Sequence, residues 1–176
     1  MEVFEALKKR RAVRHFKPDT IPEEVLRKLV YAARRAPTGG NVPYRRTMVV
    51  NDQKTIALLK HVCPGILSDP AALIVIYTDL MVAEKLGRLG REVTSLIDAG
   101  AAAENVALAA IALGLGTCFT KSYSETGVRE ILSIPDEYRT EVIMQLGYPR
   151  EDIPPALRAK PGEEVVYLNR FGERWG

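Results

Sequence analysis

Apolar residues recur along much of the chain at the spacing of helices, and the clearest example follows Thr20. There the apolar positions fall on one helical face, at Val25, Leu26, Leu29, Val30 and Ala33. Thr20 and Glu23 have the spacing of a capping box, and Pro22 lies in the predicted first turn. Pro37 prevents the helix from continuing, because proline lacks the backbone N–H that a helix needs.

The same periodicity predicts four more helices. They cover residues 2–10, 52–59, 91–113 and 124–132. The third of them is apolar almost all round in its second half, so we expect it to run through the centre of the molecule. Gly114 and Gly116 follow its last turn, and glycine is the usual residue just beyond a helix end.

Short apolar runs predict the strands. They cover residues 47–50, 72–77, 141–146 and 164–168, and residues 116–120 form a short strand or a turn. The run ALIVIY at 72–77 is unbroken, which is typical of a strand buried on both faces. Helices and strands alternate unevenly, which favours an α+β fold, and the length suits a single domain over residues 1–176.

Composition places the chain among ordinary globular proteins, with 47% hydrophobic and 27% charged residues. The first residues do not have the pattern of a signal peptide, and no apolar run reaches the length of about 20 residues that a membrane span needs. Cys63 and Cys118 are too few for a disulfide framework. We therefore expect a cytoplasmic protein.

Positive charge is concentrated near the N-terminus. Residues 1–46 hold 12 of the 25 Lys and Arg but only five of the 22 Asp and Glu. Such a region suits nucleic acid, a membrane surface or a phosphorylated small molecule. Arg10, Arg11 and Arg14 follow a predicted helix end and can converge on one phosphate, because guanidinium groups match phosphate oxygens with paired hydrogen bonds. The alternative interpretation is a solvated basic helix end, and no nucleic-acid-binding motif accompanies it.

The segment APTGGNVPYRR at 36–46 is a loop between a helix and a strand. Its prolines and glycines break both kinds of element. Adjacent glycines let a backbone come close to a ligand, since no side chain keeps the ligand away. The loop is therefore a second candidate for ligand contact.

Three other patterns are weaker. The turn GLGTC follows a helix instead of a strand, which is the wrong order for a dinucleotide-binding turn. Cys118 with His15 or His61 would make a thiol enzyme, but a buried, inert cysteine is the more common case. His61 and Cys63 could supply two metal ligands, and no second closely spaced pair completes a site, so no metal is expected.

Four motifs in order resemble the nitroreductase family of FMN-dependent oxidoreductases. They are RRAVRHF, APTGGNVP, the long alanine-rich helix ending in GLGTC, and LGYP followed by LRAKP. Together they span nearly the whole chain, at the length of a minimal member. The resemblance implies a central, mostly antiparallel sheet flanked by helices, with a C-terminal extension that wraps the partner subunit. It also implies a homodimer with FMN at the subunit interface.

The resemblance further implies which residues contact FMN. Arg10, Arg11 and Arg158 would hold the phosphate, with Lys160 as a helper, and Arg14 would lie beside the pyrimidine edge of the ring. The loop would meet the flavin of the other subunit, and the turn after the long helix would lie near flavin N5 and O4. The remaining contact residues are Ala12, Pro37, Thr38, Gly39, Asn41, Leu115 and Gly116.

The chain departs from the family pattern at three places. Ala12 stands where a serine is frequent, so one hydroxyl contact is missing, and Gly40 replaces a residue that is often polar. The chain is short between Asp69 and Leu89, where larger members carry polar residues for the N3 and O4 edge of the flavin. The substrate pocket is the part that these departures affect most.

The activity implied is hydride transfer from NAD(P)H through flavin N5 to a nitroaromatic, a quinone or a related electron-poor acceptor. FMN carries this chemistry, so no catalytic side chain is expected, although Arg14 would stabilise the reduced flavin. Two other classes stay open. One is a basic nucleic-acid-binding module without flavin, and the other is a flavin-binding or flavin-modifying protein that does not oxidise NAD(P)H.

Overall fold

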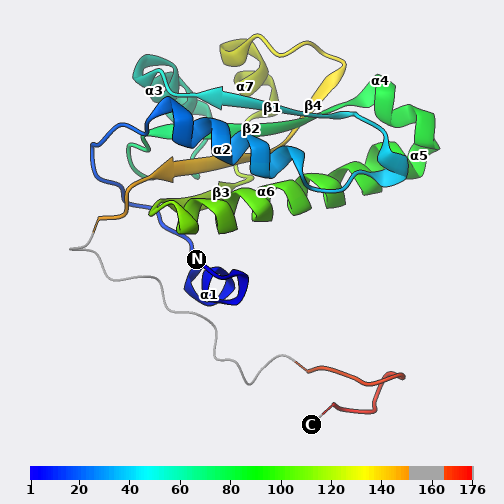
Figure 1. Ribbon diagram of the computed structural model, residues 1–176. Coiled ribbons are helices and arrows are strands. Elements are labelled where there is room, and N and C mark those ends of the chain that lie inside the picture. Colours follow the sequence, from blue (N-terminus) through cyan, green and yellow to red (C-terminus); the bar gives the residue numbers. More distant parts are fainter. Residues whose placement is uncertain (151–164, 176) are drawn as a thin grey trace.

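The computed structural model describes residues 1–150 and 165–175, and its centre is a four-stranded antiparallel sheet (Figure 1). The strand order is β1-β2-β4-β3. The strands are β1 (Arg45–Val50), β2 (Ala72–Asp79), β3 (Gly116–Thr120) and β4 (Tyr138–Gly147). β1, β2 and β4 lie where the sequence predicts strands, β3 lies where it predicts a short strand or a turn, and the α+β prediction is confirmed.

β2 is buried on both faces, as its unbroken apolar run predicts. Leu73 and Val75 belong to the core on one side of the sheet, and Ile74 and Ile76 to the core on the other. The alternation follows from the pleat of a strand, which sends successive side chains to opposite faces. In the register with β4, Ile74 lies opposite Met144.

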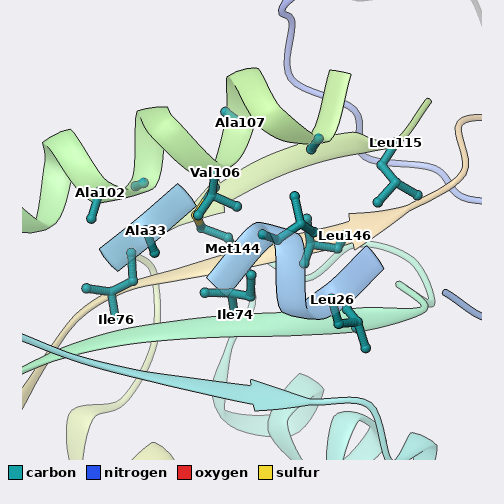
Figure 2. Packing of buried hydrophobic residues seen from close by; sticks show 14 of the residues in the cluster. Leu26, Ala33, Ile74, Ile76, Ala102, Val106, Ala107, Leu115, Met144 and Leu146 are labelled. Carbon is teal, nitrogen blue, oxygen red and sulfur yellow. The ribbon is translucent and has the colours of Figure 1, made fainter. Parts of the chain in front are cut away.

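Helices cover both faces of the sheet. α2 (Glu23–Arg34) and α6 (Ser95–Ala112) pack on one face, while α3 (Gln53–Val62) and α7 (Glu125–Leu132) pack on the other (Figure 1). α1 (Val3–Lys9) lies on the outer side of α6. Figure 2 shows the core on the side of Ile74 and Ile76, where apolar side chains of α2, α6, β2 and β4 meet. Short turns precede α6: α4 (Leu80–Ala83), η2 (Glu84–Leu86), α5 (Gly87–Leu89) and η3 (Gly90–Thr94).

The start of α2 differs from the prediction. The capping box of Thr20 and Glu23 does not form, because the helix begins at Glu23 and Pro22 occupies the N-cap position without a side-chain cap. The backbone N–H groups of Val25 and Leu26 donate to the Pro22 carbonyl. The apolar face is as predicted, since Leu26, Leu29 and Ala33 are buried.

α6 is the central helix that the sequence predicts, and glycine ends it. Gly114 takes a φ of +77°, which an L side chain rarely adopts. The N–H of Leu115 donates to the Ala110 carbonyl at 2.8 Å, and the N–H of Gly114 to the Ile111 carbonyl at 3.1 Å. These two bonds form a Schellman motif, which satisfies carbonyls that the helix end would otherwise leave without donors.

Within the described residues, one helical stretch, Leu80–Ala112, is long and apolar enough by length and composition alone to cross a membrane. α6 forms its second half and supplies Ala99, Ala102 and Val106 to the core between the sheet and α2 (Figure 2). The core position of α6 explains why this stretch is apolar.

The C-terminal strand prediction at 164–168 is not met in the part that the structure describes. Residues 165–168 form no ladder, and Tyr167 instead makes an isolated antiparallel bridge with Arg174. All side chains from 165 to 175 are exposed. An apolar run becomes a strand only beside a neighbouring strand, and the sheet of the same chain offers none here. Arg158 and Lys160 lie outside the described residues.

Candidate functional site

The basic segment after α1 runs extended along the edge of the sheet. Ala12 forms a parallel bridge with Thr117, and the Val13 N–H donates to the Thr117 carbonyl at 2.8 Å. Further along, the Lys17 N–H donates to the Tyr148 carbonyl at 2.8 Å. These contacts bring RRAVRHF, GLGTC and LGYP side by side, although they are far apart in the sequence. Two of the four predicted motifs and the described part of a third, LGYP, therefore share one location, at the C-terminal end of α6.

Two glycines allow this close approach. A Cβ atom on Gly116 would lie 2.6 Å from the Val13 Cβ, and one on Gly147 would lie 2.7 Å from the Phe16 Cδ1. Both distances are shorter than van der Waals contact permits, so any larger residue would push the basic segment away from the sheet. The predicted role of Gly116 thus has a packing reason that is independent of any ligand.

The predicted phosphate-binding arginines lie at this end of α6. Arg10 Nε is 3.1 Å from Glu104 Oε1 on α6. Arg11 and Arg14 are exposed, and neither pairs with a carboxylate among residues 1–150 and 165–175. The Ser68 hydroxyl donates to the Arg14 carbonyl at 2.7 Å and fixes the backbone there. Among the described residues, the guanidinium groups of Arg11 and Arg14 are thus open to an anionic ligand.

In the turn GLGTC after α6, backbone N–H groups already donate hydrogen bonds within the protein. The Leu115 N–H donates to the Ala110 carbonyl in the α6 cap, so this atom is already satisfied. Leu115 is buried, whereas Gly116 begins β3 opposite Gly147. Leu115 and Gly116 therefore lie beside the basic segment, and the Leu115 N–H is used by the helix end; their contact with flavin N5 and O4 stays a prediction.

The predicted loop contacts lie at the opposite end of α6. η1 (Gly39–Asn41) contains two residues with positive φ, Gly40 at +57° and Asn41 at +55°. The Gly39 N–H donates to Asp98 Oδ2 at 2.7 Å, and the Tyr44 hydroxyl donates to the same oxygen. Asp98 and Tyr44 are buried. Burial, and then the neighbouring carboxylate, raise the pKa of Tyr44 to about 12.

Arg45 holds the start of the loop through hydrogen bonds to backbone carbonyls. Its guanidinium donates to four backbone carbonyls at 2.9–3.2 Å, those of Ala33, Ala36, Pro37 and Asp98. It thereby satisfies the C-terminal end of α2 and ties the loop to α6. Burial lowers the pKa of Arg45, and the charge of Asp98 acts against this shift. Sequence reasoning missed Tyr44, Arg45 and Asp98, although an acidic residue within a nearly apolar helix is a signal that could have found Asp98.

The two groups of predicted residues do not meet within one chain. Asp98, which holds the loop, lies 14 residues before Ala112, the last residue of α6. At 1.5 Å per residue, this separates the loop end from the basic end by about 21 Å along the helix. Figure 1 shows the same separation, with α1 beside the C-terminal half of α6 and the loop near α4 and α5.

The alternative chemistries gain no support from the geometry. Cys118 and Cys63 are buried, and burial raises the pKa of both thiols, that of Cys63 to about 11. The charge of Arg14 offsets part of the shift at Cys118. These thiols are therefore protonated and poor nucleophiles near neutral pH. Across the described part of the chain, no three His, Cys, Asp or Glu side chains gather where they could hold a metal ion.

Comparison with known proteins identifies the fold. The model of the nitroreductase family matches residues 7–70 and 57–148. A protein of Methanothermobacter thermautotrophicus, provisionally named NADH dehydrogenase/NAD(P)H nitroreductase, is 29% identical over 97% of this chain and 88% of its own. An NADPH-dependent oxidoreductase of Staphylococcus aureus is 26% identical over 96% of this chain and 74% of its own. The solved structure of an FMN-dependent nitroreductase from Clostridium difficile has a TM-score of 0.79 and 26% identity, covering 96% of this chain and 99% of that one.

The chain belongs to the nitroreductase family, and it is an oxidoreductase. The family, the fold and the enzyme class predicted from the four motifs are confirmed. The family match and its FMN-dependent member also bear out FMN as the cofactor. The individual contact residues remain predictions.

Proposed function

We propose that the protein is an FMN-dependent oxidoreductase that takes hydride from NAD(P)H and reduces nitroaromatics, quinones or related electron-poor acceptors. The observation that carries this proposal is the meeting of RRAVRHF, GLGTC and LGYP at the C-terminal end of α6. Residues 1–176 act as one domain, and the cytoplasm is the proposed location.

The basic end holds the cofactor. Arg10 and Arg11, with Arg158 and Lys160 from the C-terminal segment, bind the FMN phosphate by charge-assisted hydrogen bonds. When bound, FMN accepts hydride from the donor and passes electrons to the acceptor. Arg14 places positive charge beside the pyrimidine edge of the ring, where negative charge accumulates on reduction. Val13 and Gly116 keep this segment against the sheet, so the cations are held in position before the cofactor arrives.

A homodimer completes the site. The outer surface of α1 and α6 exposes large apolar side chains, including Phe4 at 86% and Ile97 at 65%. A patch of this kind is typical of a subunit interface. If two copies pair across α6 with a two-fold axis, the loop end of one chain lies beside the basic end of the other. Pro37, Thr38, Gly39 and Asn41 then contact the partner's flavin. The exposed segment 165–175, with Phe171 and Trp175, has the character of an arm that reaches the partner.

The site accommodates donor and acceptor in turn over one face of the ring. The protein positions two flat molecules and needs no nucleophile, so alternating binding predicts ping-pong kinetics. The loop is held rigidly by Asp98 and Arg45, which limits the motion needed when one molecule replaces the other.

An anaerobic stopped-flow experiment tests the reaction. Purified protein should be yellow and release FMN on denaturation. Mixing it with NADH or NADPH should bleach the flavin, and a quinone should restore the colour. If neither donor bleaches bound FMN, the protein is a flavin-binding or flavin-modifying protein instead. A colourless protein whose nucleic-acid affinity falls steeply with salt would support the basic binding module.

Substitutions test the assignment of the phosphate site. Each lost charge-assisted hydrogen bond should cost about 1.5–3 kcal/mol, which is one to two decades in FMN affinity. Arg10→Ala and Arg158→Ala should therefore purify with little flavin. Lys9→Ala is the matched control, because Lys9 is a neighbouring cation that pairs with Glu5. Full FMN occupancy in both arginine variants would refute the assignment.

A further inference from the structure

The connection between α3 and β2, residues 63–71, reaches the basic segment from the α3 side of the sheet. In this connection, the Ser68 hydroxyl donates to the Arg14 carbonyl at 2.7 Å. On either side of Arg14, the N–H groups of Val13 and Lys17 donate to backbone carbonyls at the sheet edge. Ser68 therefore adds a side-chain anchor at the residue whose guanidinium is assigned to the flavin ring.

Gln145 on β4 holds this connection against the sheet. Its Nε2 group donates to the Gly65 carbonyl at 2.9 Å and to the Thr120 hydroxyl oxygen at 2.7 Å. Glycine is needed at position 65 for this approach, because a Cβ atom there would lie 2.6 Å from Thr120 Cγ2. The height of the connection above the sheet is thus fixed, and with it the place where Ser68 meets Arg14.

The stability of the core does not explain why position 145 is polar. Gln145 is fully buried, and its neighbours on β4, Met144 and Leu146, are buried apolar residues. Its Oε1 atom has no hydrogen-bond partner among the described residues. A buried polar atom without a partner destabilises the folded state. The bond to the Gly65 carbonyl is what an apolar side chain at this position could not provide.

The charge of Arg14 acts on the same layer of side chains. Cys118 lies opposite Gln145 in the register of β3 and β4, and paired residues of neighbouring strands share a face of the sheet. Burial raises the pKa of the Cys118 thiol, and the charge of Arg14 partly offsets this rise. Because such interactions weaken with distance, the Arg14 guanidinium is within electrostatic reach of the layer that residues 63–71 cover.

We propose that Ser68 and Gln145 are positioning residues that hold Arg14 for the reduction of the flavin. This inference rests on the proposed function, in which Arg14 places positive charge beside the pyrimidine edge of the ring. The stabilisation of developing negative charge depends on how closely and how rigidly the cation is held. Loss of the Ser68 anchor should therefore weaken the stabilisation of reduced flavin, while the phosphate contacts of Arg10 and Arg11 keep the cofactor bound.

The midpoint potential of bound FMN, measured by anaerobic dithionite titration with a reference dye, tests the proposal without NAD(P)H. Ser68→Ala should lower it by about 15 mV or more, which corresponds to at least a threefold lower equilibrium constant for a two-electron reduction. Gln145→Met should shift it in the same direction. Ser68→Thr keeps the hydroxyl and should restore the wild-type potential. Ser122→Ala, at an exposed position after β3, is the matched control and should leave the potential unchanged.

Hydrogen exchange provides a readout that needs no cofactor. In flavin-free protein, the amides of residues 13–17 should exchange at least threefold faster in Ser68→Ala and in Gln145→Met than in the wild type, because the segment has lost an anchor. Ser68→Thr and Ser122→Ala should exchange at the wild-type rate. Unchanged exchange in both of the first two variants would overturn the proposal.

A double-variant cycle separates positioning of Arg14 from a general loosening of the fold. Arg14→Ala should itself lower the potential, and adding Ser68→Ala to it should cause no further fall, because the two changes remove the same interaction. Equal shifts by Ser68→Ala with and without Arg14, or no shift in either background, would overturn the proposal. If neither NADH nor NADPH bleaches the wild type but the shift depends on Arg14, the proposed reaction is wrong and the positioning role stands.

Discussion

The two ends of α6 differ in how their polar groups are used. At the loop end, Asp98 accepts two hydrogen bonds, and the Arg45 guanidinium donates to four carbonyls. At the basic end, Arg11 and Arg14 are exposed and have no carboxylate partner among the described residues. The first arrangement fixes a backbone shape, whereas the second offers charge to a ligand. A substitution at the loop end should therefore cost folding stability, and one at the basic end should cost cofactor affinity.

Asp98→Ala gives the largest expected loss of stability. The substitution removes the acceptor of the buried Tyr44 hydroxyl, and the Gly39 N–H keeps only the Tyr44 oxygen, at 3.2 Å. The free energy of unfolding should fall by about 2–4 kcal/mol, since each unsatisfied buried group costs about 1–3 kcal/mol. Urea unfolding of the flavin-free protein measures it. Asp19→Ala, at an exposed position, serves as the control and should change stability by less than about 0.5 kcal/mol.

High pH should weaken the loop end through Tyr44. Its pKa is raised from 10.0 to about 12 in the folded protein, so the unfolded chain loses this proton at a lower pH than the folded one. The stabilisation that the protonated Tyr44 hydroxyl gives to the folded protein is complete below pH 10 and is lost as the pH rises toward 12. Two pKa units correspond to about 2–3 kcal/mol. Tyr44→Phe should remove this part of the alkaline decline. If the free energies of unfolding of Tyr44→Phe and the wild type fall in parallel between pH 9 and pH 12, this role of Tyr44 is contradicted.

Gly39→Ala tests how closely the loop packs on η3. A Cβ atom at Gly39 would overlap the Thr94 methyl group. We expect a loss of about 1–3 kcal/mol from overpacking, measured as a change in the denaturation midpoint. Thr94→Ser removes the methyl group, so the double variant should recover most of the loss. If Thr94→Ser gives no recovery, the close contact is not the cause.

Arg11→Ala should have the smallest effect on folding. Without flavin, the stability of the variant should stay within about 0.5 kcal/mol of the wild type, because the side chain is exposed and has no carboxylate partner in the described chain. With FMN present, the affinity should fall at least tenfold. A large loss of stability in the flavin-free protein would remove the contrast between the two ends.

Local patterns predicted much of the fold. The apolar face of α2, the doubly buried run in β2 and the glycine end of α6 follow from residue spacing and backbone preference, so they need no knowledge of neighbours. The motifs also pointed to the family and to the arginine cluster. Thr20 was wrong as a helix cap, because Pro22 places the helix boundary two residues later.

Contacts between distant residues account for what the sequence did not predict. Asp98 meets Gly39 across 59 positions, and no local pattern encodes that pairing. The role of Arg45 depends on where α2 ends and where α6 passes. The C-terminal segment forms no strand ladder in residues 165–168, because strand formation needs a neighbouring edge that this chain does not place beside it.

The central claim is that one flavin contacts the basic end of one chain and the loop end of the other, and a hybrid dimer tests it most directly. One chain carries Arg10→Ala/Arg11→Ala, and the other carries Thr38→Trp, which places a large ring where the partner's flavin is expected. Each variant alone should purify without FMN. Heterodimers isolated through two different tags should regain one flavin per dimer, half the wild-type content, because one of their two sites combines two intact ends. Heterodimers that remain free of flavin, while both variants stay folded, would contradict the account and place the site within a single chain.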